Sequence, residues 1–301
     1  MTGMVPTACT NSHRSASGIA GVGAPKLPPA VERVARARWR DSVATGGTRV
    51  LPEEVPIAFT YNGASHAVMM ATPCDLEDFA VGFSLTEGII ADVGQIETLD
   101  VVAAQDGIEL RLWIEKPQDE ALRERRRRLA GPTGCGLCGV ESLAEALRPL
   151  PPIARTGAVP VTSIRAALEE IVAHQKLNQQ THAVHAAAFC RPERGMILRE
   201  DIGRHNALDK LAGALARGRL QAAEGFLVLS SRVSIEMVQK AAVMGVPIIV
   251  AVSAPTALAV RACETAGLTL IAIARSDGFE LFTHPDRIIS GAGIGAVAAR
   301  A

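Results

Sequence analysis

The sequence has no net charge and no long uninterrupted apolar run. Its 31 Lys and Arg residues balance 31 Asp and Glu residues, so no chain-wide field attracts nucleic acid or an anionic membrane. The longest apolar tract, Met244 to Val260, is interrupted by Pro247, Ser253 and Pro255, whereas a membrane helix needs about 20 consecutive apolar residues. The tract predicts a strand, a turn and a helix. We expect a globular protein with neither a nucleic-acid nor a membrane partner.

Cysteine is sparse and scattered. The chain has six, of which only two are close together: Cys9, Cys74, Cys135, Cys138, Cys190 and Cys263. This spacing is unlike the disulfide framework of a small secreted scaffold. Residues 1 to about 30 mix Ser, Thr, Gly and Pro and lack the apolar run of a signal peptide. We therefore expect a cytoplasmic protein whose segment 1–45 is a disordered tail.

Three segments of different composition follow the tail. Residues 46–130 contain strand-like runs around a helical segment, Asp75 to Thr86, which predicts a small α+β domain. Residues 131–152 are rich in glycine and end in prolines, as a loop and linker does. Residues 153–301 alternate short apolar runs with helical periods, and strands of that kind are covered by helices on both faces. The sequence thus predicts an α/β protein with a three-layer α/β/α C-terminal domain.

The most informative motif is segment 134–139, Gly-Cys-Gly-Leu-Cys-Gly, whose glycines leave both sulfurs uncovered. The arginine-rich residues 123–128 precede it and favour the thiolate, the reactive form of cysteine. Because there is no second CxxC, we expect no bound metal. A thioredoxin-like site would lie between a strand and a helix, and a dinucleotide loop would follow an apolar strand. A nucleophilic cysteine on a loop fits best, with a structural turn as the alternative.

A histidine motif lies within the predicted C-terminal domain. A helix that starts near Gly203 would place His205 and Asp209 one turn apart on the same face, with Asp201 as its cap. A carboxylate beside an imidazole fixes its tautomer and raises its pKa. His205 is therefore a candidate proton donor or anion contact, and a capped helix with one ion pair is the alternative.

Two strand ends carry residues that suit an anion. Ser231 and Arg232 follow one predicted strand and segment 253–256 follows the next, each ahead of a helix. Amides at helix N-termini attract anions, and open α/β sheets bind ligands beyond the carboxyl ends of their strands. The pattern favours a ligand with phosphate groups, although ordinary N-capping explains the same residues.

Taken in order, three segments resemble the formate dehydrogenase accessory sulfurtransferase (FdhD) family. They are 133–139 (Thr-Gly-Cys-Gly-Leu-Cys-Gly), 201–207 (Asp-Ile-Gly-Arg-His-Asn-Ala) and 230–240 (Ser-Ser-Arg-Val-Ser, then Glu236, Met237 and Lys240). The resemblance implies a homodimer and a cytidine-deaminase-like fold for the C-terminal domain. Deaminase chemistry does not follow, because the H-x-E and P-C-x-x-C signatures are absent.

The resemblance also implies a sulfur carrier. Such proteins take sulfur from a cysteine desulfurase as a persulfide and deliver it to the molybdenum bis(molybdopterin guanine dinucleotide) cofactor of formate dehydrogenase. The persulfide cysteine maps to Cys135, and Cys138 matches the second cysteine. The guanine-dinucleotide segment maps to Ile273, Ala274, Arg275, Ser276, Asp277 and Gly278, with Ile273 where an aromatic residue is expected.

The remaining candidate contacts for this cofactor are Ser231, Arg232 and His205, and GDP is its expected surrogate ligand. Two other functions stay open at this point. One is a chaperone that binds the cofactor without moving sulfur. The other is a thiol-disulfide oxidoreductase that uses Cys135 and Cys138 together.

Overall fold

The computed structural model describes residues 26–129, 149–153, 157–192 and 194–290. The first unit is a four-stranded sheet in the order β4-β3-β6-β5. Its elements are β3 (Val55–Tyr61), β4 (Ala64–Ala71), α1 (Leu76–Thr86), β5 (Ile96–Ala104), β6 (Gly107–Ile114) and α2 (Lys116–Leu129). The turn Asn62-Gly63, with both residues at positive φ, joins β3 to β4 as tight hairpins require.

The second unit is a six-stranded sheet in the order β13-β12-β11-β10-β8-β9. Its strands are β8 (His185–Arg191), β9 (Gly195–Asp201), β10 (Phe226–Leu229), β11 (Ile248–Ala251), β12 (Thr269–Ala272) and β13 (Glu280–Thr283). Residues 226–229, 248–251 and 269–272 are buried throughout, as strands covered on both faces are.

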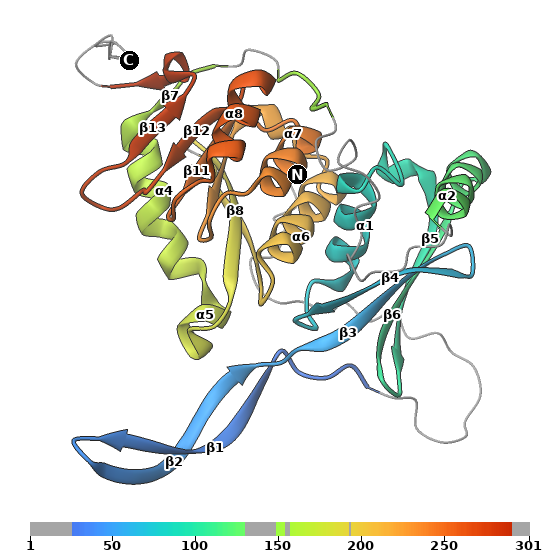
Figure 1. Cartoon of the computed structure of the whole chain (residues 1–301), viewed down its shortest axis with the longest axis horizontal. Coiled ribbons are helices and arrows are strands. Elements are labelled where there is room, and N and C mark those ends of the chain that lie inside the picture. Colours follow the sequence, from blue (N-terminus) through green and yellow to red (C-terminus); the bar gives the residue numbers. More distant parts are fainter. Residues whose placement is uncertain (1–25, 130–148, 154–156, 193, 291–301) are drawn as a thin grey trace.

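Helices cover both faces of this sheet (Figure 1). α6 (Arg204–Arg217), α7 (Ile235–Met244) and α8 (Ala257–Ala266) pack on one face, and α4 (Val161–His174) packs on the other. The α/β class and the three layers predicted from the sequence are therefore confirmed. Segment 244–260 forms the end of α7, then β11 and the start of α8, in agreement with its predicted strand, turn and helix.

The described residues also form several short elements. They are η1 (Val93–Gln95), β7 (Val159–Pro160), α5 (Lys176–Thr181), η2 (Ala222–Glu224), η3 (Pro285–Arg287) and β14 (Ile288–Ile289).

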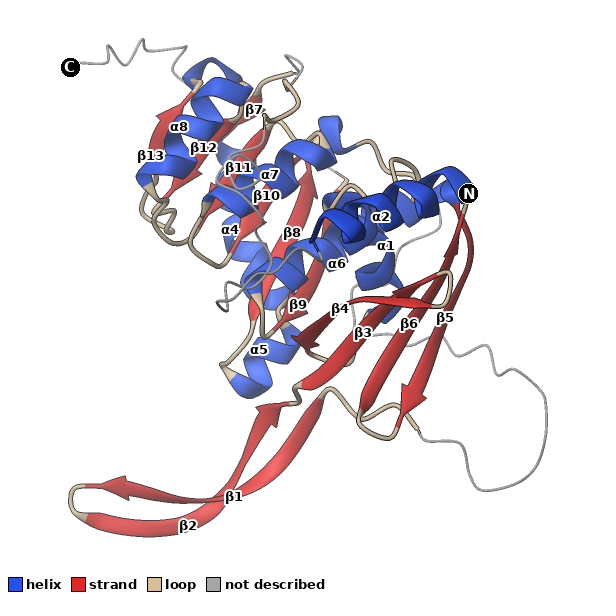
Figure 2. Cartoon of the chain, turned by 45° about the vertical axis from the view of Figure 1, so that its right-hand side comes forward, coloured by secondary structure: helices blue, strands red, loops and turns tan. Residues whose placement is uncertain are grey.

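A long hairpin corrects the predicted tail. β1 (Val31–Arg40) and β2 (Val43–Pro52) pair antiparallel over ten residues each, so residues 31–45 of the predicted tail form a strand, a turn at 41–42 and the start of a second strand rather than disordered chain. In both views the hairpin projects away from the two sheets (Figure 2). The alternating Arg, Ala and Val residues of 31–40 carry the strand signal, which the polar character of the preceding residues concealed.

The two units meet where α1 crosses α6. A Cβ atom on Gly82 of α1 would lie 1.7 Å from the Asp209 carbonyl oxygen, and one on Gly213 of α6 would lie 1.8 Å from the Asp78 carbonyl oxygen. The two helices thus touch backbone to backbone, each through a glycine. On its other side α1 inserts Phe79 and Phe83 into the core of the four-stranded sheet.

We expect Gly82→Ala and Gly213→Ala each to lower the free energy of unfolding by about 1–3 kcal/mol or more, because the added methyl overlaps backbone that cannot move alone. Alanine's higher helix propensity, worth about 1 kcal/mol, is too small to compensate. Urea denaturation measures the change. Gly46→Ala is the control, because a Cβ there meets nothing within 4 Å. Equal stabilities for Gly82→Ala and Gly46→Ala would disprove the close crossing.

Candidate functional site

Cys135 and Cys138 lie outside the described residues, as does Cys9. The three cysteines that the structure describes are Cys74, Cys190 and Cys263, and all three are buried. Burial raises the pKa of the Cys190 thiol, and it raises the pKa of Cys263 to about 12. These two thiols stay protonated at neutral pH and are poor nucleophiles, so neither of them rivals the predicted pair.

Four strands of the six-stranded sheet end at one edge. β9, β10, β11 and β12 run in the same direction, and α6, α7 and α8 each start at this edge, after β9, β10 and β11 respectively. We call it the carboxyl edge. Every candidate cofactor residue predicted from the sequence lies on its loops or at its helix starts, so the structure brings them to one side of the domain.

The loops of the carboxyl edge are bonded to one another. Val233, after β10, forms a parallel bridge with Pro255, after β11. The Ile273 amide, after β12, donates to the Ser253 carbonyl at 3.3 Å. These contacts make a continuous surface from the start of α7 to segment 273–278.

Segment 273–278 is a tight turn. The Arg275 amide donates to the Gly278 carbonyl at 2.7 Å, and Ile273 has φ of +52°, a left-handed conformation that is rare for a β-branched residue. The Arg275 guanidinium donates to the carbonyls of Val252 and Ala274, which holds its charge beside the β11 loop. Ser276 and Asp277 are exposed.

In the loop between β10 and α7, Ser231 is buried and Arg232 is exposed. The Ser231 hydroxyl donates to the Arg232 carbonyl at 3.1 Å. Two further side-chain atoms there are buried and have no hydrogen-bond partner, Ser234 Oγ at the N-cap of α7 and Arg204 Nε at the start of α6. Because an unpaired buried donor costs about 1–3 kcal/mol, both are suited to a ligand oxygen. Neither Arg204 nor Ser234 is among the contacts predicted from the sequence, although both lie inside the quoted motifs.

The partner predicted for His205 is wrong. His205 Nε2 lies 2.8 Å from Glu236 Oε2 on α7, whereas Asp209 points to other groups. Burial lowers the pKa of His205, and Arg204 and Lys240 act in the same direction against Glu236. His205 is thus neutral at neutral pH and available to give or take a proton. Adjacent helices supply the pair, which spacing along one helix could not reveal.

Asp209 belongs to a buried network below His205. Thr86 of α1 donates its hydroxyl proton to Asp209 Oδ1 at 2.6 Å, and Lys240 of α7 donates to the same oxygen at 2.9 Å. Lys240 also donates to Glu87 at 2.8 Å. Although burial opposes it, Asp209 and Glu87 raise the pKa of Lys240, so the lysine is charged. This network ties α1, α6 and α7 together under the carboxyl edge.

Asp201 is also not the predicted cap. The N-cap of α6 is Gly203, and the Asp201 carboxylate accepts from the Gly203 amide at 2.7 Å and from the Thr72 amide at 3.0 Å. It pairs with fully buried Lys210 at 2.7 Å. Asp201 therefore joins the two units and fixes the chain path into α6.

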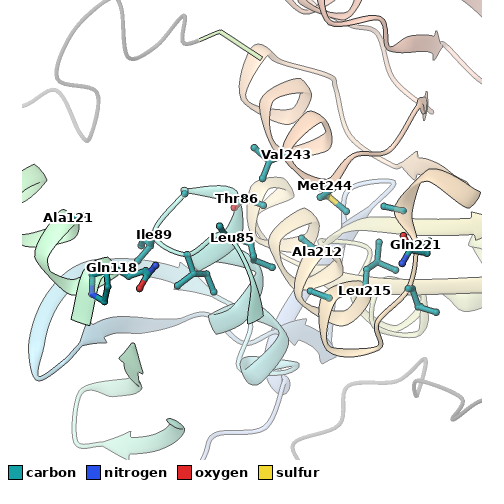
Figure 3. A pocket seen from close by; sticks show the side chains of 17 residues that line it. Leu85, Thr86, Ile89, Gln118, Ala121, Ala212, Leu215, Gln221, Val243 and Met244 are labelled. Atoms are coloured by element: carbon teal, nitrogen blue, oxygen red, sulfur yellow. The ribbon is translucent and has the colours of Figure 1, made fainter. Parts of the chain in front are cut away.

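A separate apolar cavity of about 670 Å³ opens at the other end of α7 (Figure 3). Its walls include Leu85, Ala212, Leu215 and Val243. Gln118 of α2 also lines it, with its buried Oε1 unpaired. The described residues that line the cavity carry no charge, and it lies away from the carboxyl edge, so it does not join the candidate cofactor residues.

Two further features are absent from the part of the chain that the structure describes. It contains no group of three or more His, Cys, Asp or Glu side chains arranged to hold a metal ion. None of its helices is both long enough and apolar enough to cross a membrane.

A family model, curated relatives and a solved structure all match this chain, and their descriptions agree with one another. The model of the FdhD/NarQ family matches residues 52–289. Proteins named sulfur carrier protein FdhD are 49% identical over 259 residues in Agrobacterium fabrum (85% of this chain, 96% of that protein) and 54% identical over 244 residues in Brucella abortus (80% and 91%). A crystal structure of a protein described as a putative formate dehydrogenase accessory protein, from Desulfotalea psychrophila, has a TM-score of 0.70 at 25% identity, covering 87% of this chain and all of that one.

We expect Lys240→Met to destabilise the protein by about 3–5 kcal/mol, because it leaves the Asp209 carboxylate buried without its partner. Lys116→Met is the control, since Lys116 is exposed and lies 4.0 Å from Glu120. Thermal unfolding followed by circular dichroism makes the comparison. If Lys240→Met and Lys116→Met unfold at the same temperature, the network does not stabilise the fold.

Proposed function

The chain belongs to the FdhD/NarQ family, and from this premise we propose that it is a sulfur carrier that serves a molybdenum-dependent formate dehydrogenase. Cys135 accepts sulfur from a cysteine desulfurase. The acceptor is the molybdenum bis(molybdopterin guanine dinucleotide) cofactor, which the chain binds as a substrate. The observation that carries the proposal is the glycine-flanked cysteine pair of segment 134–139 in a chain whose Cys190 and Cys263 thiols are held protonated.

The loading step is a thiol exchange. The Cys135 thiolate attacks the outer sulfur of the persulfide on the desulfurase, a new S–S bond forms, and the donor cysteine leaves as a thiolate. Atoms and charge balance without an added oxidant. The arginine-rich residues 123–128 favour the attacking thiolate. Only Gly136 and Leu137 separate Cys135 from Cys138, so a second thiol is close enough along the chain to reach the same sulfur.

The carboxyl edge is suited to the nucleotide ends of the cofactor. Those ends carry phosphates, and the edge combines the first turns of α7 and α8 with the arginines of segments 230–234 and 273–278. The unpaired donors Arg204 Nε and Ser234 Oγ add two positions for phosphate oxygens. Segment 273–278, Ser231, Arg232 and His205 are the proposed contacts, and His205 is the one among them that can exchange a proton at neutral pH.

Further parts of the proposal follow from the family resemblance. The protein acts in the cytoplasm as a homodimer, with the desulfurase and formate dehydrogenase as partners. A cofactor chaperone that moves no sulfur would tolerate loss of either cysteine. A thiol-disulfide oxidoreductase would need both Cys135 and Cys138.

We expect the peptide that contains Cys135 to gain the mass of one sulfur atom when the protein is incubated with a desulfurase and cysteine. Mass spectrometry of the digested protein locates the addition. Cys135→Ala should abolish it, whereas Cys263→Ala should not, because the buried Cys263 thiol is not ionised. Sulfur found only on Cys9, Cys74, Cys190 or Cys263 would contradict the assignment.

We also expect GDP to bind with a dissociation constant below about 1 mM, a binding free energy of roughly 4 kcal/mol, and more tightly than ADP. Arg275→Ala should weaken binding because it removes a charge from the carboxyl edge. Cys135→Ala should leave binding unchanged, since capture and loading use different residues. Calorimetry measures all four affinities. Normal loading of Cys135 without GDP binding would remove the cofactor site and leave the sulfur carrier.

A further inference from the structure

Arg204 is a half-buried arginine without a counter-ion. It is the first residue of α6, its Nε is buried, and its guanidinium makes no hydrogen bond or ion pair with any residue that the structure describes. Arg199 and Arg217, in contrast, both pair with Asp78. Removing a charge from water is costly unless a partner is gained, so Arg204 leaves an uncompensated positive charge at the carboxyl edge.

His185 lies on the same side of the sheet as the start of α6. It is the first residue of β8, which is antiparallel to β9 and β10, and it pairs with Asp201, the last residue of β9. Side chains alternate along a strand, so His185 shares a face with Ala187 and Phe189, which pack in one cluster with Leu208 of α6. The imidazole is therefore at the carboxyl edge, on the face that α6 covers.

His185 is neutral at neutral pH. Burial lowers its pKa, Arg204 lowers it further, and Asp201 acts in the opposite direction. Asp201 is not available to neutralise Arg204, because its carboxylate pairs with Lys210 at 2.7 Å and accepts from the Gly203 amide. The ring of His185 makes no hydrogen bond within the described part of the chain, so it is open to a ligand.

His205 is in the same state on the other side of this charge. Burial lowers its pKa against Glu236, and Arg204 and Lys240 lower it further. Glu236 is half exposed and lies 2.8 Å from Nε2 of the imidazole. A bound anion would offset the guanidinium charge, and this would raise the pKa of each neighbouring imidazole and favour its protonated form.

We propose that Arg204, His185 and His205 form a binding site for a diphosphate group, and that the two histidines take up protons when the group binds. The inference rests on the proposed function, in which the nucleotide ends of the cofactor supply the diphosphate. It adds His185 to the contacts and makes binding at this site dependent on pH.

The chemistry of the three side chains fits a diphosphate. A guanidinium can donate to two phosphate oxygens at once, and each protonated imidazole adds a donor and a positive charge. The protons come from the solvent, and no bond to phosphorus forms or breaks. Because binding takes up protons, a fall in pH strengthens it, and a rise in pH through the pKa values of the occupied site releases the group.

The first test follows the histidines of the full chain by NMR titration between about pH 5 and pH 9. The titration is made without ligand, with GDP and with inorganic pyrophosphate, and H185Q and H205Q assign the signals. We expect both anions to raise the pKa of His185 and of His205. His284 is the control, because it is 28% exposed beside Glu264, as His205 is 30% exposed beside Glu236, but follows β13 at the opposite edge of the sheet. Its signal should not move.

The second test uses calorimetry of GDP binding in buffers with different heats of ionisation, which counts the protons taken up. We expect R204Q to weaken binding about tenfold, a loss of about 1.4 kcal/mol, and to reduce the proton uptake. R204K keeps the charge but not the planar donors, so it should bind less tightly than the parent and retain the uptake. H185Q/H205Q should bind without uptake.

The control for these variants is R194Q, which removes an exposed arginine from the loop before β9, at the other end of that strand. It should match the parent in affinity and in proton uptake. Equal unfolding temperatures of all variants and the parent establish that folding is intact.

The proposal is overturned if R204Q binds GDP as tightly as the parent does, or if GDP binds without a change in the pKa of either histidine. Failure of the proposed function has a different signature. If the parent does not bind GDP but pyrophosphate still raises both pKa values, the diphosphate site stands and the cofactor assignment fails. If neither anion moves them, the site itself is absent.

Discussion

The contact between α1 and α6 sets the arrangement of the two units. Gly82 and Gly213 let the two helix backbones touch, which brings the charged side chains around the crossing into the interior. Arg199 of β9 lies there with its guanidinium 2.7 Å from Asp78 of α1. Lys210 and Lys240 are buried nearby against Asp201 and Asp209. Ion pairs so deeply buried tolerate little displacement, because separating them leaves charge without solvent.

This crossing also positions the carboxyl edge. α6 carries Asp209 toward α1 and His205 toward α7, while α7 supplies Lys240 and Glu236 four residues apart. The lower pair, Asp209 and Lys240, is tied to Thr86 of the first unit. The upper pair, His205 and Glu236, lies beside the unpaired donors. The small sheet and α1 thereby help to position the helix starts at which we place the cofactor.

Features that leave a local pattern in the sequence could be predicted from it, whereas contacts between segments far apart in the chain could not. The uniformly apolar strands, such as residues 226–229 and 248–251, could be read from the sequence because burial on both faces leaves a continuous signature. The pairing of His205 with Glu236 could not, because helix spacing describes neighbours on one helix only. The close approach of Gly82 to Gly213 was equally hidden, since a glycine within a helix reads as a weak helix former. The β1–β2 hairpin was missed because the polar residues that precede it concealed the alternating pattern of residues 31–40.

The most direct test of the central claim follows labelled sulfur from the protein to the cofactor. The chain is loaded with radiolabelled sulfur on Cys135, freed of the donor, and mixed with molybdenum bis(molybdopterin guanine dinucleotide) that lacks the sulfur to be transferred. The account predicts that the label leaves the protein for the cofactor and that excess GDP slows the transfer by competing at the carboxyl edge. Label that stays on Cys135 in the presence of the cofactor would contradict it.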